Sequence, residues 1–221
     1  MLEMENKFLI TSLRISAWIF IAMKKVRCWK TDNPLYIKYH DEEWGIPLHD
    51  DNKLFEFLTL DGFQAGLTWE LILKRREGLR KAFDNFDPKK IEKYDDKDIQ
   101  RLMNDPYVIK NKAKILASIN NAHKFHEVQK DFGSFDAFIW QFVDGKTVDH
   151  ALKSFSDLPP DSEESKAMSK ELKKRGFKFV GPTICYAFMQ AAGLVNDHLT
   201  FCFRYDDIRK MTRKNVKHRN I

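Results

Sequence analysis

The sequence predicts an all-α protein, and three observations support this class. Apolar residues recur at helical spacing, as Leu54, Phe57 and Leu58 do. Cap-plus-proline pairs such as Asp87-Pro88 and glycines after apolar runs divide the chain into helix-sized pieces. No segment shows the sustained alternation of a β-strand. With 221 residues, 43% of them hydrophobic, the chain is long enough for one large domain or two small ones.

The N-terminal segment, residues 1–22, differs in composition from the rest. Its apolar stretch is short for a membrane span. Glu3 and Glu5 occupy the region where a signal peptide carries positive charge, and no small-residue cleavage site follows. We favour a third interpretation, in which translation begins at Met23, and we expect residues 1–22 to lie outside the fold.

The predicted helices alternate with short breaks, and each has a local reason. In order, we expect helices at 52–61 on an apolar face, at 70–83 with charge on the outer face, after Asp87-Pro88, at 95–103 before Asp105-Pro106, and at 111–128 around Ile115 and Ile119. After the Gly133-Ser134 cap we expect a helix at 135–143 with Trp140 buried, a loop over 144–163, and helices at 165–175 and 183–192, the last ended by Gly193.

The ends of the chain and its charge limit the remaining choices. Residues 204–221 are basic and lack apolar periodicity, so we expect a disordered tail that can contact DNA, after a domain spanning 23–203. A net charge of +6 suits a phosphate partner without requiring one. Three scattered cysteines argue against a disulfide framework and for a reducing, cytoplasmic location.

Asp61 is the first candidate site residue. Leu54, Phe57, Leu58 and Asp61 share one helical face, which is apolar except for this acid. A buried carboxylate needs hydrogen-bond donors, or its pKa rises. Gly62 and Gly66 follow, so the backbone can approach a ligand there. The pattern predicts a pocket for a flat ligand with donors; the alternative is a helix-ending turn in which Asp61 bonds nearby backbone.

Two further stretches suggest nucleic-acid contacts. Rings crowd the segment from Cys28 to Gly45, which suits a core or a stacking platform for bases. Later, Lys173, Lys174, Arg175 and Lys178 surround a turn between two helices, and Gly181 precedes a proline that starts the second helix. Free amides at that helix start and the nearby cations predict a phosphate site; the alternative is a solvated basic loop.

A metal site is the remaining candidate. His198 and Cys202 are four residues apart, so one helical face or tight turn can direct both at one ion. Cys28 and His40 are the natural candidates for the other two ligands, which would complete a Cys2His2 set. The alternative is buried thiols and ordinary structural histidines.

These motifs together resemble the DNA-3-methyladenine glycosylase I (Tag) family. The resemblance runs from about Arg27 to Cys202, and it rests on the following stretches: Pro34-Leu-Tyr-Ile37, Tyr39-His-Asp41, Glu43-Trp-Gly45, Gln64-Ala-Gly-Leu-Thr-Trp69, Lys173-Lys-Arg-Gly-Phe-Lys-Phe-Val-Gly181 and Leu194-Val-Asn-Asp-His198. It implies a helix-hairpin-helix fold and a structural Zn²⁺ on Cys28, His40, His198 and Cys202. One departure stands out, because the family's pocket acid is commonly glutamate and this chain has Asp61.

The resemblance also implies an activity. A 3-methyladenine base would flip from double-stranded DNA into a pocket formed by Tyr36, Tyr39, Asp61 and Trp69, with Trp44 nearby. The segment of Gln64, Gly66 and Leu67 would lie against the gap in the base stack. Asp61 is then the catalytic candidate. No lysine matches the pocket, so we expect a monofunctional hydrolase that acts as a monomer without a membrane. The alternatives are a non-catalytic damage-binding module and a zinc metallohydrolase; four protein ligands argue against the second.

Overall fold

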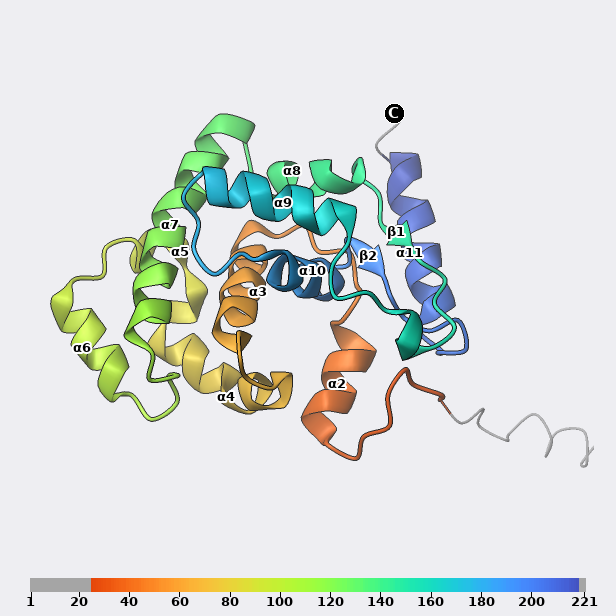
Figure 1. The fold of residues 1–221 in the computed structure, drawn as a ribbon, viewed down its shortest axis with the longest axis horizontal. Helices are drawn as coiled ribbons and strands as arrows, with labels where there is room; N and C mark the ends of the chain where they lie inside the picture. The colour runs from red at the N-terminus through yellow and green to blue at the C-terminus, as the bar shows by residue number, and fades with distance from the viewer. Residues whose placement is uncertain (1–24, 219–221) are drawn as a thin grey trace, which may run out of the picture.

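The computed structural model describes the backbone of residues 25–218 and the side chains of residues 25–212. The described chain is mostly helical, with two short strands (Figure 1), which is consistent with the predicted all-α class. None of its helices combines the length and the apolar composition that a membrane span requires. The expectation for residues 1–22 lies outside the described residues.

The helices follow one another with short connections. In chain order they are α2 (Pro34–Glu42), α3 (Asp51–Gln64), α4 (Trp69–Ala82), η1 (Asp84–Phe86), α5 (Pro88–Ile91), α6 (Asp96–Asn104), α7 (Lys112–Phe132), α8 (Phe135–Trp140), η2 (Gln141–Val143), η3 (Phe155–Asp157), α9 (Glu163–Lys174), α10 (Pro182–Ala191) and α11 (Tyr205–His218). Two-residue strands, β1 (Val148–Asp149) and β2 (Val195–Asn196), pair in parallel.

Side-chain caps fix where most of these helices begin. The side chains of Asp50, Thr68, Asp95, Asn111 and Ser134 each accept a hydrogen bond from a first-turn amide. The predicted helices therefore match the observed ones to within a few residues. Helix α2 was not predicted, although the same signal marks it: the Asn33 side chain accepts from the amide of Leu35, and Pro34 occupies the first turn.

The core lies around α3 and α10, which occupy the centre of the molecule (Figure 1). Helix α10 packs against both α3 and α9, and α3 also packs against α4, α7 and α8. Aromatic rings fill much of this space; Phe55 meets Phe125 edge to face at 5.2 Å between ring centroids. The predicted burial of Trp140 is confirmed, since it is 3% exposed.

The C-terminal segment corrects one expectation. Residues 204–221 were expected to be a disordered tail, but α11 is a helix whose first turns belong to the fold. Tyr205 and Ile208, three apart, are buried on one face, and Tyr205 donates a hydrogen bond to Asp149 in β1 (3.1 Å). Arg209 also pairs with Asp149 (3.0 Å). The domain therefore extends beyond the predicted boundary at 203. The sequence did not reveal this, because the apolar stripe is short and is surrounded by charged residues.

Candidate functional site

A cavity of about 610 Å³ opens between α2, α3 and α4 on one side and the loop around η3 on the other. Its lining includes all four predicted aromatic residues and the predicted acid. The lining residues are Trp29, Lys30, Thr31, Tyr36, Tyr39, Trp44, Asp61, Gln64, Thr68, Trp69, Glu70, Phe155, Leu158, Ala187 and Gln190.

Asp61 lies at the inner end of this cavity with almost no solvent contact. Its side chain projects from α3, which continues to Gln64, so Asp61 is inside a helix rather than at its end. It is 2% exposed, and its Oδ2 atom has no hydrogen-bond partner. Burial raises the pKa of Asp61 well above its usual value, while the charge of Arg76 opposes this rise. An unpaired buried carboxyl facing a cavity supports the ligand interpretation over the turn interpretation.

Aromatic rings form the walls on either side of this acid. Tyr39 of α2 is buried, and its ring centroid lies 5.2 Å from that of Trp69, the first residue of α4. Trp69 Nε1 is buried without a hydrogen-bond partner. Trp44 connects the cavity to the neighbouring histidine cluster, because its ring packs 4.6 Å from His198 and 4.8 Å from Trp29. The cavity that contains Asp61 therefore also offers flat ring faces and an unsatisfied donor.

Trp29, Phe155 and Leu158 are cavity residues that the sequence did not reveal. Trp29 resembles Trp69 in having a buried, unpartnered Nε1, and its place in an aromatic cluster was the only signal for it. Phe155 and Leu158 come from the long loop over 144–163, where no pattern distinguished them from solvent-exposed residues. Lys30 also lines the cavity, and its side chain is exposed.

The loop after α3 has a defined shape. Gly66 has φ of +76°, which favours glycine, and a Cβ there would meet no atom within 4 Å. Leu67, next to it, is 37% exposed, an unusual position for a leucine beside a polar-lined opening. Lys114 of α7 is buried and donates hydrogen bonds to the carbonyls of Phe63 and Ala65 (2.8 and 2.7 Å). These bonds hold the end of α3, so the loop is presented from a fixed base.

The segment joining α9 to α10 is fixed to its neighbours and carries exposed lysines. Asn121 of α7 both accepts from the Lys178 amide and donates to its carbonyl (2.8 and 2.9 Å). Lys173, Lys174 and Lys178 are exposed, although Lys174 lies 3.9 Å from Glu171, whereas Arg175 is half-buried and pairs with Asp131 and Glu171 (2.9 and 3.0 Å). Three of the four predicted cations are thus exposed to solvent, where an anion can approach them.

The start of α10 completes the predicted phosphate site. Gly181 is the N-cap of this helix and has no side chain to cap it, and Pro182 follows. The N-cap residue therefore offers no side chain to accept hydrogen bonds from the first amides of α10. Such amides attract anions.

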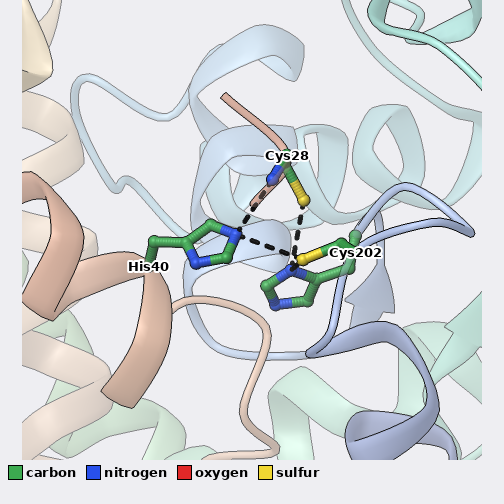
Figure 2. Close-up of side chains that lie close together, drawn as sticks. Cys28, His40 and Cys202 are labelled. Carbon is green, nitrogen blue, oxygen red and sulfur yellow. Dashed lines mark hydrogen bonds between the residues drawn. The ribbon is translucent and has the colours of Figure 1, made fainter. Parts of the chain in front are cut away.

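Cys28, His40, His198 and Cys202 form one buried cluster, although they come from opposite parts of the chain. The ligand-capable atoms all lie within 4.8 Å of one another. Cys28 Sγ lies 3.3 Å from His198 Nδ1, and Cys202 Sγ lies 3.5 Å from His40 Nε2. Figure 2 shows Cys28, His40 and Cys202 directed toward a common point. The predicted set is therefore brought together, and it could hold a metal ion.

The comparisons with known proteins agree with this arrangement. The sequence model of the methyladenine glycosylase family matches residues 29–205. The chain is 47% identical to DNA-3-methyladenine glycosylase 1 of Escherichia coli (strain K12) over 180 residues, which cover 81% of this chain and 96% of that protein.

Two solved structures share the fold. A crystal structure of 3-methyladenine DNA glycosylase I superposes with a TM-score of 0.78 at 48% identity, covering 80% of this chain and 98% of the other. A variant of 3-methyladenine DNA glycosylase I, crystallised in complex with 3-methyladenine, superposes with a TM-score of 0.77 at 38% identity, covering 78% of this chain and 93% of the other.

A mostly helical domain with a buried acid inside an aromatic cavity has the features of a protein suited to a flat ligand. The family model and the relatives described above each match most of the chain, and they identify its family. The chain belongs to the methyladenine glycosylase family.

Proposed function

We propose that this protein is a repair glycosylase that hydrolyses the N-glycosidic bond of 3-methyladenine in alkylated double-stranded DNA. The observation that carries the proposal is the unpartnered, 2% exposed carboxyl of Asp61 inside an aromatic cavity, in a chain of this family. A cavity of about 610 Å³ has room for a purine that has left the base stack. Flipping costs a few kcal/mol and is easiest where pairing is already damaged.

The chemistry of the lesion suits the residues around the cavity. N3-methylation places a positive charge on the purine in DNA, which makes the base a good leaving group. Tyr39 and Trp69 supply ring faces that attract a cation. A carboxylate at Asp61 complements the charge and accepts hydrogen bonds from the N–H edge of the base. Asp61 is therefore the proposed catalytic residue, with Tyr36, Tyr39, Trp44 and Trp69 as base-binding residues.

We propose a monofunctional hydrolase. The conversion of a cationic base to a neutral free base drives the departure, and water completes the reaction at the sugar. No amine is needed for this route, and the exposed Lys30 side chain has no buried environment that would favour the neutral amine a lyase requires.

We propose that two segments contact DNA: the one that joins α9 to α10 and the loop that follows α3. The α9–α10 unit would act as the helix-hairpin-helix element, with Lys173, Lys174, Arg175, Lys178 and Gly181 near a phosphate. The exposed Leu67, with Gln64 and Gly66, would enter the gap left by the flipped base. The buried bonds from Lys114 support this role, because a wedge must resist the pressure of the base stack.

We propose that the Cys28, His40, His198 and Cys202 cluster holds a structural Zn²⁺. Tetrahedral zinc keeps neighbouring sulfur and nitrogen ligands roughly 3.4–3.8 Å apart. Two of the sulfur–nitrogen separations here, 3.5 and 3.6 Å, lie in that range, and the third, 3.3 Å, lies just below it.

The surroundings of the histidines support the same proposal. His40 Nδ1 is 2.8 Å from Asp41 Oδ1, and His198 Nε2 is 3.0 Å from the Trp44 carbonyl, which orient the rings as in known zinc sites. When bound, the metal would tie the ends of the domain together and take no part in the reaction.

The decisive experiment is to incubate the purified protein with methylated duplex DNA and identify the bases that are released. Release of 3-methyladenine supports the proposal. Tight binding without release would instead indicate a damage-binding module. A metallohydrolase would lose activity on chelation while its fold persists, whereas a structural zinc predicts that both are lost together. Sedimentation of the full chain with a damaged duplex tests the expected monomer.

A further inference from the structure

Arg76 occupies a buried position behind the base pocket, where three pocket helices meet. It projects from α4, the helix that begins with Trp69, and only 7% of it is exposed. Its Nε donates to Glu56 of α3 (2.7 Å), and its NH1 nitrogen donates to Glu43, directly after α2 (2.6 Å). The guanidinium of this α4 residue thus bonds both to α3 and to the end of α2.

These three helices carry the pocket. Helix α2 supplies Tyr39, α3 supplies Asp61, and α4 supplies Trp69. A planar guanidinium with donors at fixed angles is better suited than an ammonium to hold two carboxylates at once. The guanidinium also lies 5.1 Å from the centre of the Phe57 ring, which limits its movement. The spacing of the aromatic walls and the acid therefore depends on one side chain.

We propose that Arg76 is a positioning residue of the base pocket, which holds the three pocket helices together and places a buried positive charge behind Asp61. The inference rests on the proposed function, because it concerns how the same pocket reads a cationic base. Arg76 is not among the residues that line the cavity, so it acts on the base through Asp61 and the helices it links.

The charges around Asp61 determine the expected effect. Arg76 of α4 is the charged group that acts on Asp61, and burial, together with the charge of Asp61, raises the pKa of Tyr39 of α2 and of Cys185 of α10. The charged groups on the other elements packed against α3 are engaged elsewhere. Lys114 of α7 donates to carbonyls that follow Asp61 in the chain, and Asp84 of η1 accepts from Tyr94. Helix α8 meets α3 at Asp51, which lies at the other end of α3. Arg76 is the cation that lowers the pKa of Asp61 against burial. Glu43 and Glu56 partly neutralise that cation.

Two substitutions separate an electrostatic role from a purely structural one, because both break the same 2.6 Å ion pair. Arg76→Gln removes the positive charge, so the acidic limb of the pH profile for base release should move up by about one unit. Glu43→Gln leaves the positive charge less neutralised, so the limb should move down. Arg76→Lys keeps the charge but not the double contact; its limb should stay near the wild-type position while stability falls.

The measurement is single-turnover release of 3-methyladenine from methylated duplex DNA by the full-length protein between about pH 4 and pH 9, a range that spans ordinary and raised carboxyl pKa values. Arg80→Gln is the matched control, since Arg80 also bonds to Glu56 (2.8 Å) but makes no bond to Glu43. Its acidic limb should not move.

Opposite displacements for Arg76→Gln and Glu43→Gln support the inference, and Glu43→Gln alone carries the test if Arg76→Gln does not fold. Two results would overturn it: an equal loss of base-release rate in both variants with no displacement of the acidic limb, or a rate that does not change with pH in either wild type or Arg76→Gln. A wild-type protein that releases no base would instead overturn the proposed function.

Discussion

The Cys/His cluster, which is the proposed metal site, and the aromatic cavity, which is the proposed base pocket, both contact Trp44, but they differ in whether their buried polar groups have partners. In the cluster, the histidine nitrogens that face away from the centre contact Asp41 or a carbonyl, and the Leu199 amide donates to Cys28 Sγ. In the pocket, Asp61 Oδ2, Trp29 Nε1 and Trp69 Nε1 are buried with no partner. Buried groups with partners from the protein stabilise the fold, whereas several unpartnered groups around one cavity are candidates for contact with a ligand.

Removing a cluster thiol should have the largest effect, because it disturbs the metal and the fold at once. Cys202→Ser should lower zinc content and the free energy of unfolding together, since metal binding is linked to folding. Metal analysis and chemical denaturation measure both. Cys185→Ser is the matched control: Cys185 is equally buried but lies outside the cluster, so zinc content should stay at wild-type level. Full activity with less than stoichiometric zinc in wild type would contradict the proposed site.

Asp61→Asn should affect the pocket without affecting the cluster. The change keeps the shape of the side chain but removes its charge, so binding of the cationic base should weaken by roughly 1.5–3 kcal/mol, the usual contribution of a hydrogen bond to a charged group. Base release should fall at least comparably, with zinc content unchanged. Asp61→Glu should retain activity, because it restores the charge, although the longer side chain can crowd the pocket. Wild-type binding and release by Asp61→Asn would mean that the pocket interpretation is wrong.

The unpaired carboxyl also predicts how stability changes with pH. Burial raises the pKa of Asp61 in the folded protein, so the folded state keeps this proton at pH values where the unfolded chain has lost it. Its contribution to stability is therefore present below the ordinary aspartate pKa and is lost as pH rises toward the folded pKa. Unfolding experiments over this range should show Asp61→Asn gaining stability relative to wild type as pH increases. A constant difference would contradict the raised pKa.

The smallest effect is expected for the exposed lysines of the segment joining α9 to α10, which we propose to contact DNA. Lys174→Ala and Lys178→Ala should weaken binding to damaged and undamaged duplex about equally, and each should reduce the salt dependence of log K by about 0.9. Lys97→Ala, at an exposed lysine of α6 (Figure 1), serves as the control. A loss confined to lesion-containing DNA would assign these lysines to the pocket instead.

The sequence predicted the fold class and the cluster well because their signals are local or chemically rare. Caps such as Asp50 and Ser134 mark helix starts directly, and two Cys/His pairs have few partners to choose from. Trp29, Phe155 and Arg76 were beyond its reach, because their roles depend on which helices meet. The burial of Tyr205 and Ile208 was missed for a similar reason, since the strand that covers this helix lies far away in the sequence.

The separation of the cluster residues along the chain has a consequence for the order of assembly. Cys28 and His198 are 170 positions apart, and His40 and Cys202 are 162 apart. During synthesis Cys28 and His40 leave the ribosome long before His198 and Cys202. An ion with four ligands therefore cannot be bound until nearly the whole domain has been made. If the proposed Zn²⁺ binds there, helices α3 to α10 would pack before it does. The ion would then stabilise only those chains whose two ends have already come together.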